Sequence, residues 1–144
     1  MVYITRKAQF SAAHRLNNPI LDDKENYEIY DKCNNYWGHG HNYTIEVTIC
    51  GTPNPDTGYL IDLKQLKKII NENIISKVDH KHLNFDVDFL KGKITTLENM
   101  SAIFWQQIQD KLPSGKLFKI KMWETENNSV EYFGEEFLIK SFEN

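Results

Sequence analysis

The sequence predicts an α+β domain with strands and helices in the order β-β-α-α-β-β. Four segments alternate apolar and polar residues, as strands with one buried face do: 2–14, 39–50, 117–124 and 130–137. Two other segments, 62–76 and 95–112, repeat apolar residues at helical spacing. Because consecutive strands form hairpins, we expect a four-stranded antiparallel sheet with both helices on one face. The other face and the two edges are then uncovered, which predicts a homo-oligomer.

Length and composition are those of one domain, residues 1–144. Hydrophobic residues make up 40% of the chain, and the formal net charge of -3 argues against a nucleic-acid partner. No apolar run approaches the roughly 18–20 residues of a membrane span, and none follows the basic residues at the start. Two cysteines are too few for a disulfide scaffold, so we expect a reduced, cytoplasmic protein without a membrane partner.

The chain between these elements is expected to be irregular in two places. Residues 17–36 are polar and rich in turn formers, and a loop of that length is usually functional or disordered. Asp62 is the expected N-cap of the first helix, which should end near Ser76. A second irregular stretch follows over 77–94. The second helix should begin with a capping box between Thr95 and Glu98.

Three histidines form the best candidate for a metal site. His39 and His41 lie two residues apart on one strand, so their imidazoles project from the same face. If the first two strands pair antiparallel, His14 at the end of the first strand can come opposite them. Three neutral imidazoles and one open position are typical of catalytic zinc. The alternative is a surface pair of histidines with one core histidine.

Two places carry residues suited to proton transfer. Cys33 lies in the polar loop before the histidine pair, where a cysteine near a metal can act as base or nucleophile. The alternative is an inert buried cysteine, as we expect for Cys50. Asp79 directly precedes His80, and a carboxylate can orient an imidazole for proton transfer. The alternative there is a pair that caps a turn. His82 has no evident partner and is expected at the surface.

Glu124 is the candidate substrate anchor. It follows Trp123 near the end of a strand, where a carboxylate can accept two parallel hydrogen bonds from a guanidine-like ring edge. The alternative is a solvated glutamate that has no ligand.

These residues together resemble the family of 6-pyruvoyl-tetrahydropterin and 6-carboxytetrahydropterin synthases over nearly the whole chain. The most specific segments are FSAAHRL at 10–16 and CNNYWGHGHNY at 33–43. Weaker matches lie at 62–63, 79–84, 98–99 and 124–128. The resemblance implies a tunnelling fold, with trimers that join into a hexamer and active sites between subunits.

The resemblance also implies the site. Its residues would be a zinc set, His14, His39 and His41; an acid–base set, Cys33, Asp79 and His80; and a substrate-binding set, Thr96, Glu98 and Glu124. Family members commonly have a second threonine where this chain has Leu97. The implied substrate is 7,8-dihydroneopterin triphosphate, and the candidate cations for its phosphates are Arg15, Lys24 and Lys32.

The two activities of the family leave a choice. Five residues separate the cysteine from His-Gly-His, where 6-carboxytetrahydropterin synthases commonly have three. This spacing favours the lyase that eliminates triphosphate to give 6-pyruvoyl-tetrahydropterin, in tetrahydrobiopterin biosynthesis. The alternative is the queuosine-pathway enzyme. Hypotheses of other classes are a zinc- and pterin-binding module without turnover and a structural oligomer with incidental histidines.

Overall fold

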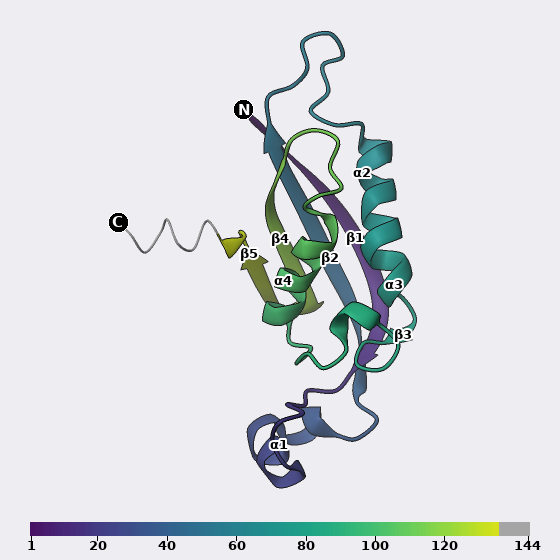
Figure 1. Cartoon of the computed structure of the whole chain (residues 1–144), viewed down its shortest axis with the longest axis vertical. Helices are drawn as coiled ribbons and strands as arrows, with labels where there is room; N and C mark the ends of the chain where they lie inside the picture. The colour runs from purple at the N-terminus through teal and green to yellow at the C-terminus, as the bar shows by residue number, and fades with distance from the viewer. Residues whose placement is uncertain (136–144) are drawn as a thin grey trace, which may run out of the picture.

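A computed structural model describes residues 1–135 as one five-stranded sheet in the order β3-β1-β2-β4-β5 (Figure 1). The strands are β1 Val2–His14, β2 His39–Gly51, β3 Lys81–His82, β4 Lys116–Thr125 and β5 Asn128–Tyr132. The four long strands pair antiparallel as predicted. The prediction missed β3, which pairs parallel with β1. A strand of two residues is too short to show an alternating pattern.

Two helical segments lie on one face of the sheet, as predicted (Figure 1). The first begins with α2, Leu63–Ile70, and continues through a π-helical turn at Asn71–Ile75 into α3, Ser76–Val78, two residues beyond the expected end. Its N-cap is Asp62, whose side chain accepts a hydrogen bond from the Lys64 amide at 2.9 Å.

The second helical segment, α4, spans Leu97–Ile108 and differs from the prediction at both ends. Its N-cap is Thr96, which accepts a hydrogen bond from the Asn99 amide, so the expected capping box between Thr95 and Glu98 is wrong. Thr95 is instead fully buried. Three residues separate the helix end from Leu112, which the periodicity had placed on the helix.

The core lies between the sheet and these helices. The buried side chains of β1 and β2 alternate along each strand, and they face the helices. Ile45 and Val47 of β2 are fully buried opposite Met122 and Ile120 of β4, and Phe104 of α4 packs in the same cluster. This alternation is what the sequence pattern predicted.

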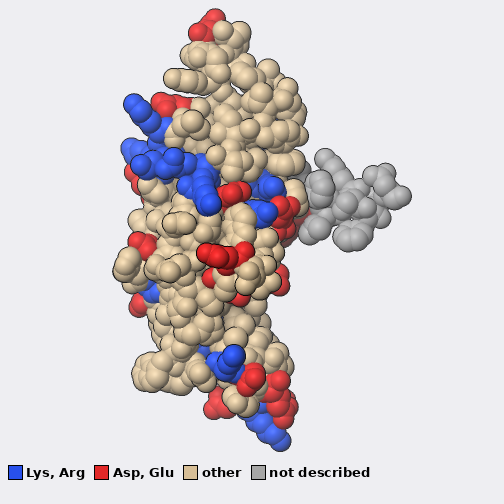
Figure 2. All heavy atoms as spheres, turned by 180° about the vertical axis from the view of Figure 1, so that it is seen from behind, with Lys and Arg blue, Asp and Glu red and all other residues tan. Residues whose placement is uncertain are grey.

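The opposite face of the sheet is polar. Lys7, Glu46 and Lys121 are neighbours across three strands, and Glu131 of β5 pairs with Lys119 at 3.3 Å and with Lys121 at 3.5 Å. Seen from behind, basic side chains gather over the upper half of the molecule, with acidic ones beside them (Figure 2). A face of this composition interacts with water or with another polar surface rather than with a hydrophobic core.

Three predictions about irregular segments are corrected. The stretch 17–36 contains α1, Asp23–Tyr30, and a 3-10 helix at Asp31–Asn34. The first of these begins with a capping box, and it buries only Asn26, so it lacks an apolar stripe. A further 3-10 helix occupies Asp88–Leu90. The last strand spans Asn128–Tyr132 rather than the predicted 130–137, so it begins and ends earlier, and residues 136–137 lie outside the described part of the chain.

Candidate active site

Strand pairing brings the three histidines together. In the antiparallel register of β1 and β2, His14 lies directly opposite His39, and Ala12 lies opposite His41. The three ring centroids are 4.7–5.2 Å apart, and one ligand atom from each imidazole lies within 4.8 Å of the others. The strand pairing on which the sequence-based prediction depended is therefore confirmed.

Gly38 permits the close approach of the two strand ends. Its φ is +77°, and a Cβ at this position would overlap the carbonyl oxygen of His14. Its amide donates to the Asn35 carbonyl at 2.8 Å and closes a tight turn just before β2. A side chain here would push the loop away from the end of β1, and with it the register that aligns the histidines.

His14 is held in a single orientation by a buried contact. Its Nδ1 donates to the Thr95 carbonyl oxygen at 2.8 Å, which leaves Nε2 with the lone pair. Nε2 is buried and has no hydrogen-bond partner within the described chain. Burial is the main cause that lowers the pKa of His14 from 6.5 to about 4, against the opposing effect of the Thr95 hydrogen bond. This imidazole is therefore neutral at pH 7, the form that binds metals.

Glu124 of β4 lies beside His41. Its Oε2 is 3.9 Å from Nε2 of His41, and the two residues line one surface cavity with Gln9, Thr44 and Trp123. Burial lowers the pKa of His41, while the Glu124 charge raises it. Because the net shift is downward, His41 is neutral at pH 7, and the contact with Glu124 is not an ion pair there. The carboxylate remains available to a ligand.

The donor set fits a metal ion. Three neutral imidazoles converge, and the buried Nε2 of His14 lacks the partner that a buried polar atom requires. Two ligands of a tetrahedral zinc ion are roughly 3.4 Å apart for bonds near 2.05 Å. The three donors lie within 4.8 Å of one another, so a small shift of each side chain would suffice to reach that spacing. The alternative of one satisfied core histidine beside a surface pair does not explain the unpartnered nitrogen.

Asp79 and His80 form the predicted pair at the edge of the sheet. Asp79 Oδ1 lies 3.0 Å from His80 Nδ1 and accepts the Ser11 amide at 2.9 Å, while the His80 amide donates to the Ser11 carbonyl at 2.7 Å. The Ser11 hydrogen bond is the main cause that lowers the pKa of Asp79, and His80 adds to it. The His80 side chain is 83% exposed, so this imidazole is oriented by its neighbour and open to a ligand.

Cys33 is close to the histidines in sequence but does not belong to their cluster. It is half-buried in the 3-10 helix Asp31–Asn34, and its carbonyl oxygen accepts the Leu16 amide at 2.9 Å. Within residues 1–135, the candidate metal-ligand group contains His14, His39 and His41 and does not contain Cys33. The Cys33 thiol is therefore available for a role other than metal binding.

The start of α4 adjoins the metal-binding end. Thr95 contacts His14, Thr96 caps the helix, and Glu98 is exposed in the first turn. Leu97, where family members commonly have a second threonine, is 6% exposed and packs in the core. Thr96 and Glu98 thus closely follow Thr95, the residue that contacts His14, and their roles toward a ligand stay predictions.

Sequence reasoning missed three residues that support the site. Thr95 was interpreted only as a cap, yet its carbonyl orients His14. Asn84 binds both backbone groups of Arg15 at 2.8 Å and so fixes the chain just after His14. His82 was expected to lack a partner, but its ring stacks on Phe85 and its Nε2 lies 3.1 Å from the Trp37 carbonyl. Neighbours distant in sequence leave no periodic pattern, so only the structure reveals them.

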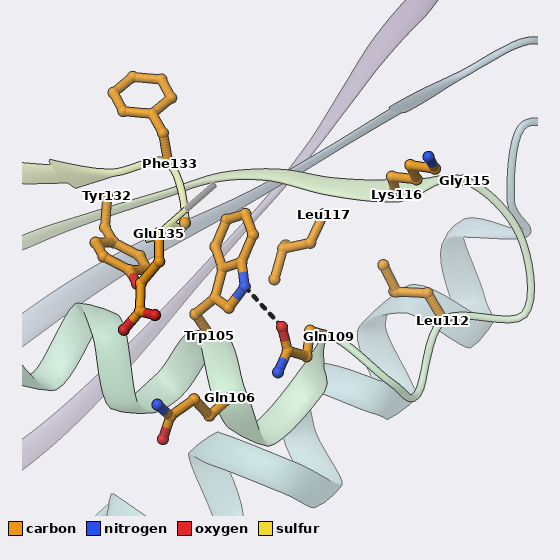
Figure 3. Close-up of a pocket in the computed structure, with 11 residues that line it drawn as sticks. Trp105, Gln106, Gln109, Leu112, Gly115, Lys116, Leu117, Tyr132, Phe133 and Glu135 are labelled. Carbon is orange, nitrogen blue, oxygen red and sulfur yellow. Dashed lines mark hydrogen bonds between the residues drawn. The ribbon is translucent and has the colours of Figure 1, made fainter. Parts of the chain in front are cut away.

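Another cavity lies between α4 and the β4–β5 hairpin (Figure 3). Trp105 forms one wall and donates its Nε1–H to Gln109 Oε1 at 3.0 Å, and Leu117 and Tyr132 line the cavity from the strands. None of the predicted site residues lines it. This cavity is therefore distinct from the three-histidine cluster, and we take the cluster as the candidate active site.

The fold and the three-histidine cluster define an α+β protein with a metal-binding site at the ends of two paired strands. The chain belongs to the 6-pyruvoyl tetrahydropterin synthase family, whose profile matches residues 3–135. A human relative named 6-pyruvoyl tetrahydrobiopterin synthase is 44% identical over 132 residues, 92% of this chain and 91% of that protein. The structure of a Caenorhabditis elegans 6-pyruvoyl tetrahydropterin synthase superposes with a TM-score of 0.88 at 38% identity, covering 93% of this chain and 96% of that one.

These similarities confirm the family and the tunnelling fold that the motifs indicated. A relative from Archaeoglobus fulgidus, named putative 6-carboxy-5,6,7,8-tetrahydropterin synthase, is 31% identical over 102 residues, 71% of each chain. This chain is therefore more similar to the human protein than to the archaeal one, in agreement with the loop spacing. Within residues 1–135, none of the helices combines the length and the apolar character that crossing a membrane requires.

Proposed function

We propose that this chain is a zinc-dependent lyase that converts 7,8-dihydroneopterin triphosphate to 6-pyruvoyl-tetrahydropterin and triphosphate. The observation that carries the proposal is the buried, unpartnered Nε2 of His14 between His39 and His41, with Glu124 adjacent. Family membership and the names of its relatives support the same activity.

Substrate binding is assigned to the cavity shared by His41 and Glu124. The Glu124 carboxylate would accept two parallel hydrogen bonds from the amino group and ring N–H of the pterin, as it can from a guanidinium. This contact would set the distance between the ring and the three histidines. Zinc, when bound by them, would make the side-chain hydroxyl and C–H protons more acidic. Thr96 and Glu98, at the start of α4, are the proposed additional contacts.

Proton transfer is assigned to Cys33 and to His80. Cys33 would take protons from the substrate side chain and return them to the ring, and His80, oriented by Asp79, would act as the complementary acid or base. The hydrogens that leave the side-chain carbons reappear on the ring, so no external reductant is needed. Triphosphate leaves, and the side chain becomes a diketone.

Cys33 and His80 can serve one reaction if the active site forms between subunits. His80 is 83% exposed at the sheet edge and lines a hollow with His41, whereas Cys33 is not among the residues that line this hollow. We propose a hexamer of two trimers, in which a neighbouring subunit supplies the missing acid–base group. The polar sheet face and the short edge strands fit such an assembly. Two free cysteines fit a reducing compartment, and the cytoplasm is the proposed location.

The test is a product analysis. The zinc-loaded protein is incubated with 7,8-dihydroneopterin triphosphate without reductant, and the side-chain product is identified by mass. A diketone-bearing tetrahydropterin with released triphosphate is expected. Release of acetaldehyde with a carboxyl-bearing pterin would assign the queuosine-pathway reaction instead. Binding of zinc and pterin without product would indicate a non-catalytic module.

A further inference from the structure

Arg15 ties the end of β1 to the segment that carries Cys33. It directly follows His14 in the chain. Its Nε donates to the Asn34 carbonyl oxygen at 2.8 Å, and its Nη2 donates to Asn34 Oδ1 at 3.3 Å. The guanidinium carbon lies 5.5 Å from the centre of the Tyr36 ring, over its face. The planar group is thus held on an edge by Asn34 and on a face by Tyr36, two residues that closely follow the proposed base Cys33.

Asn34 completes the connection from the other side. It is 6% exposed, and its Nδ2 donates to the Leu16 carbonyl at 2.7 Å and to Asn17 Oδ1 at 3.0 Å. The Leu16 amide in turn donates to the Cys33 carbonyl. A buried amide with these partners allows one arrangement of the two segments, because any shift leaves polar groups unsatisfied.

The connection is continuous with the metal-binding end. Asn84 accepts the Arg15 amide and donates to the Arg15 carbonyl, both at 2.8 Å. Thr95, whose carbonyl orients His14, also has its hydroxyl 3.4 Å from Asn84 Oδ1. The contacts that fix Arg15, and through it Cys33, therefore adjoin the contact that orients His14, a proposed metal ligand.

We propose that Arg15 and Asn34 are positioning residues that fix Cys33 relative to the three histidines. This inference rests on the proposed function, in which Cys33 moves protons. The 3-10 helix that carries Cys33 has four residues and no side-chain cap at its start, so its own hydrogen bonds hold it weakly. A displacement of about 1 Å can lower the rate of a positioned reaction by roughly 100-fold.

The competing role for Arg15 is a cation for the triphosphate. A lysine keeps the positive charge but cannot make the forked contacts or stack over Tyr36 in the same way. Arg15→Lys therefore separates the two roles. A phosphate-binding cation predicts a variant with a raised KM and a kcat near that of the wild type, whereas a positioning role predicts a lowered kcat and an unchanged KM.

The experiment compares Arg15→Lys and Asn34→Asp with Arg6→Lys, the same replacement at a position within β1. Zinc content, kcat and KM are measured, and iodoacetamide labelling rates of Cys33 and Cys50 are read separately by peptide mass. In Arg15→Lys and Asn34→Asp we expect zinc to be retained, kcat to fall about tenfold or more with KM within about twofold, and Cys33 to label at least about threefold faster. Cys50 labelling and all values for Arg6→Lys should match the wild type.

Three outcomes would overturn the positioning role: unchanged Cys33 labelling in both variants, unchanged kcat despite faster labelling, or a raised KM with kcat retained. Faster labelling of Cys50 as well would show general loosening and would also count against it. If the wild type binds zinc but does not turn the substrate over, the proposed function fails. The labelling rates then still decide whether Arg15 and Asn34 hold Cys33.

Discussion

At the ends of β1 and β2, three imidazoles converge within 4.8 Å, and a buried nitrogen of His14 has no partner within the described chain. The proposed acid–base groups differ from this cluster. The His80 side chain at the sheet edge is 83% exposed, and Cys33 does not belong to the histidine cluster. The first region is assembled by the register of a single pair of strands. The second consists of groups that are individually anchored but not brought together.

The difference follows from how each region is stabilised. Strand register fixes side chains opposite one another, so a metal site on paired strands is complete once the hairpin forms. Asp79 is anchored to β1 through Ser11, and Cys33 is anchored through Leu16, so different segments of the chain hold the two groups. A single chain therefore brings the proposed metal ligands together, whereas the proposed proton transfer would need groups from a second chain.

The largest expected effect is at the metal site. His14→Ala should lower zinc affinity by more than about 100-fold, because it removes a buried ligand rather than an outer contact. The control is His82→Ala, which removes a partnered histidine outside the cluster and should leave the zinc content unchanged. Metal per chain is measured after purification without chelators. Full zinc content in His14→Ala would show that the converging histidines are not the metal site.

Loss of the thiol should separate chemistry from metal binding. Cys33→Ala should lower kcat by roughly 10²–10⁴-fold, the usual contribution of a general acid or base. Zinc content should stay at the wild-type level, because Cys33 is outside the histidine cluster. Cys50→Ala is the matched control and should keep its activity. A zinc-loaded Cys33→Ala protein with full activity would remove Cys33 from the mechanism.

Mixed oligomers test whether the acid–base groups come from different chains. Cys33→Ala and His80→Ala are each expected to be inactive, and the two chains are co-expressed with different tags to isolate mixed assemblies. If a site takes Cys33 from one chain and His80 from another, random mixing restores about a quarter of the sites. If both come from the same chain, every site lacks one group, and mixed assemblies stay inactive.

The strand and helix pattern predicted most of the fold because apolar periodicity reports a buried face. It gave β1 at its observed bounds and both helical segments on the correct face. It missed α1, which buries one polar residue, Asn26, and β3, which has two residues. Neither element carries an apolar stripe, since capping and backbone hydrogen bonds form them.

The candidate site divides in the same way. His14, His39 and His41 were predictable because i and i+2 positions and strand pairing place them on one face. Thr95 and Asn84 were not, because their contacts with His14 and Arg15 join residues 69–81 positions apart, and no local pattern records them. The Arg15–Asn34 contact likewise needs the folded path of the intervening loop.

The smallest expected effect concerns the anchoring of the sheet-edge pair. The Ser11 amide and the His80 ring favour the ionised Asp79 carboxylate, so its pKa in the folded chain lies below the 3.8 of an unperturbed aspartate. This stabilisation is complete above about pH 4 and is lost as the pH falls through the lowered pKa of the folded state.

Asp79→Asn keeps an acceptor for Ser11 but removes the charge. Because Asp79 is 38% exposed, solvent screening limits the expected loss at pH 7 to less than about 1 kcal/mol in the free energy of unfolding. Urea unfolding of both proteins measured from pH 7 to pH 3 should show the difference shrinking toward the acid end. A difference that grows as the pH falls would mean that the folded chain favours the protonated carboxyl, contrary to the observed contacts.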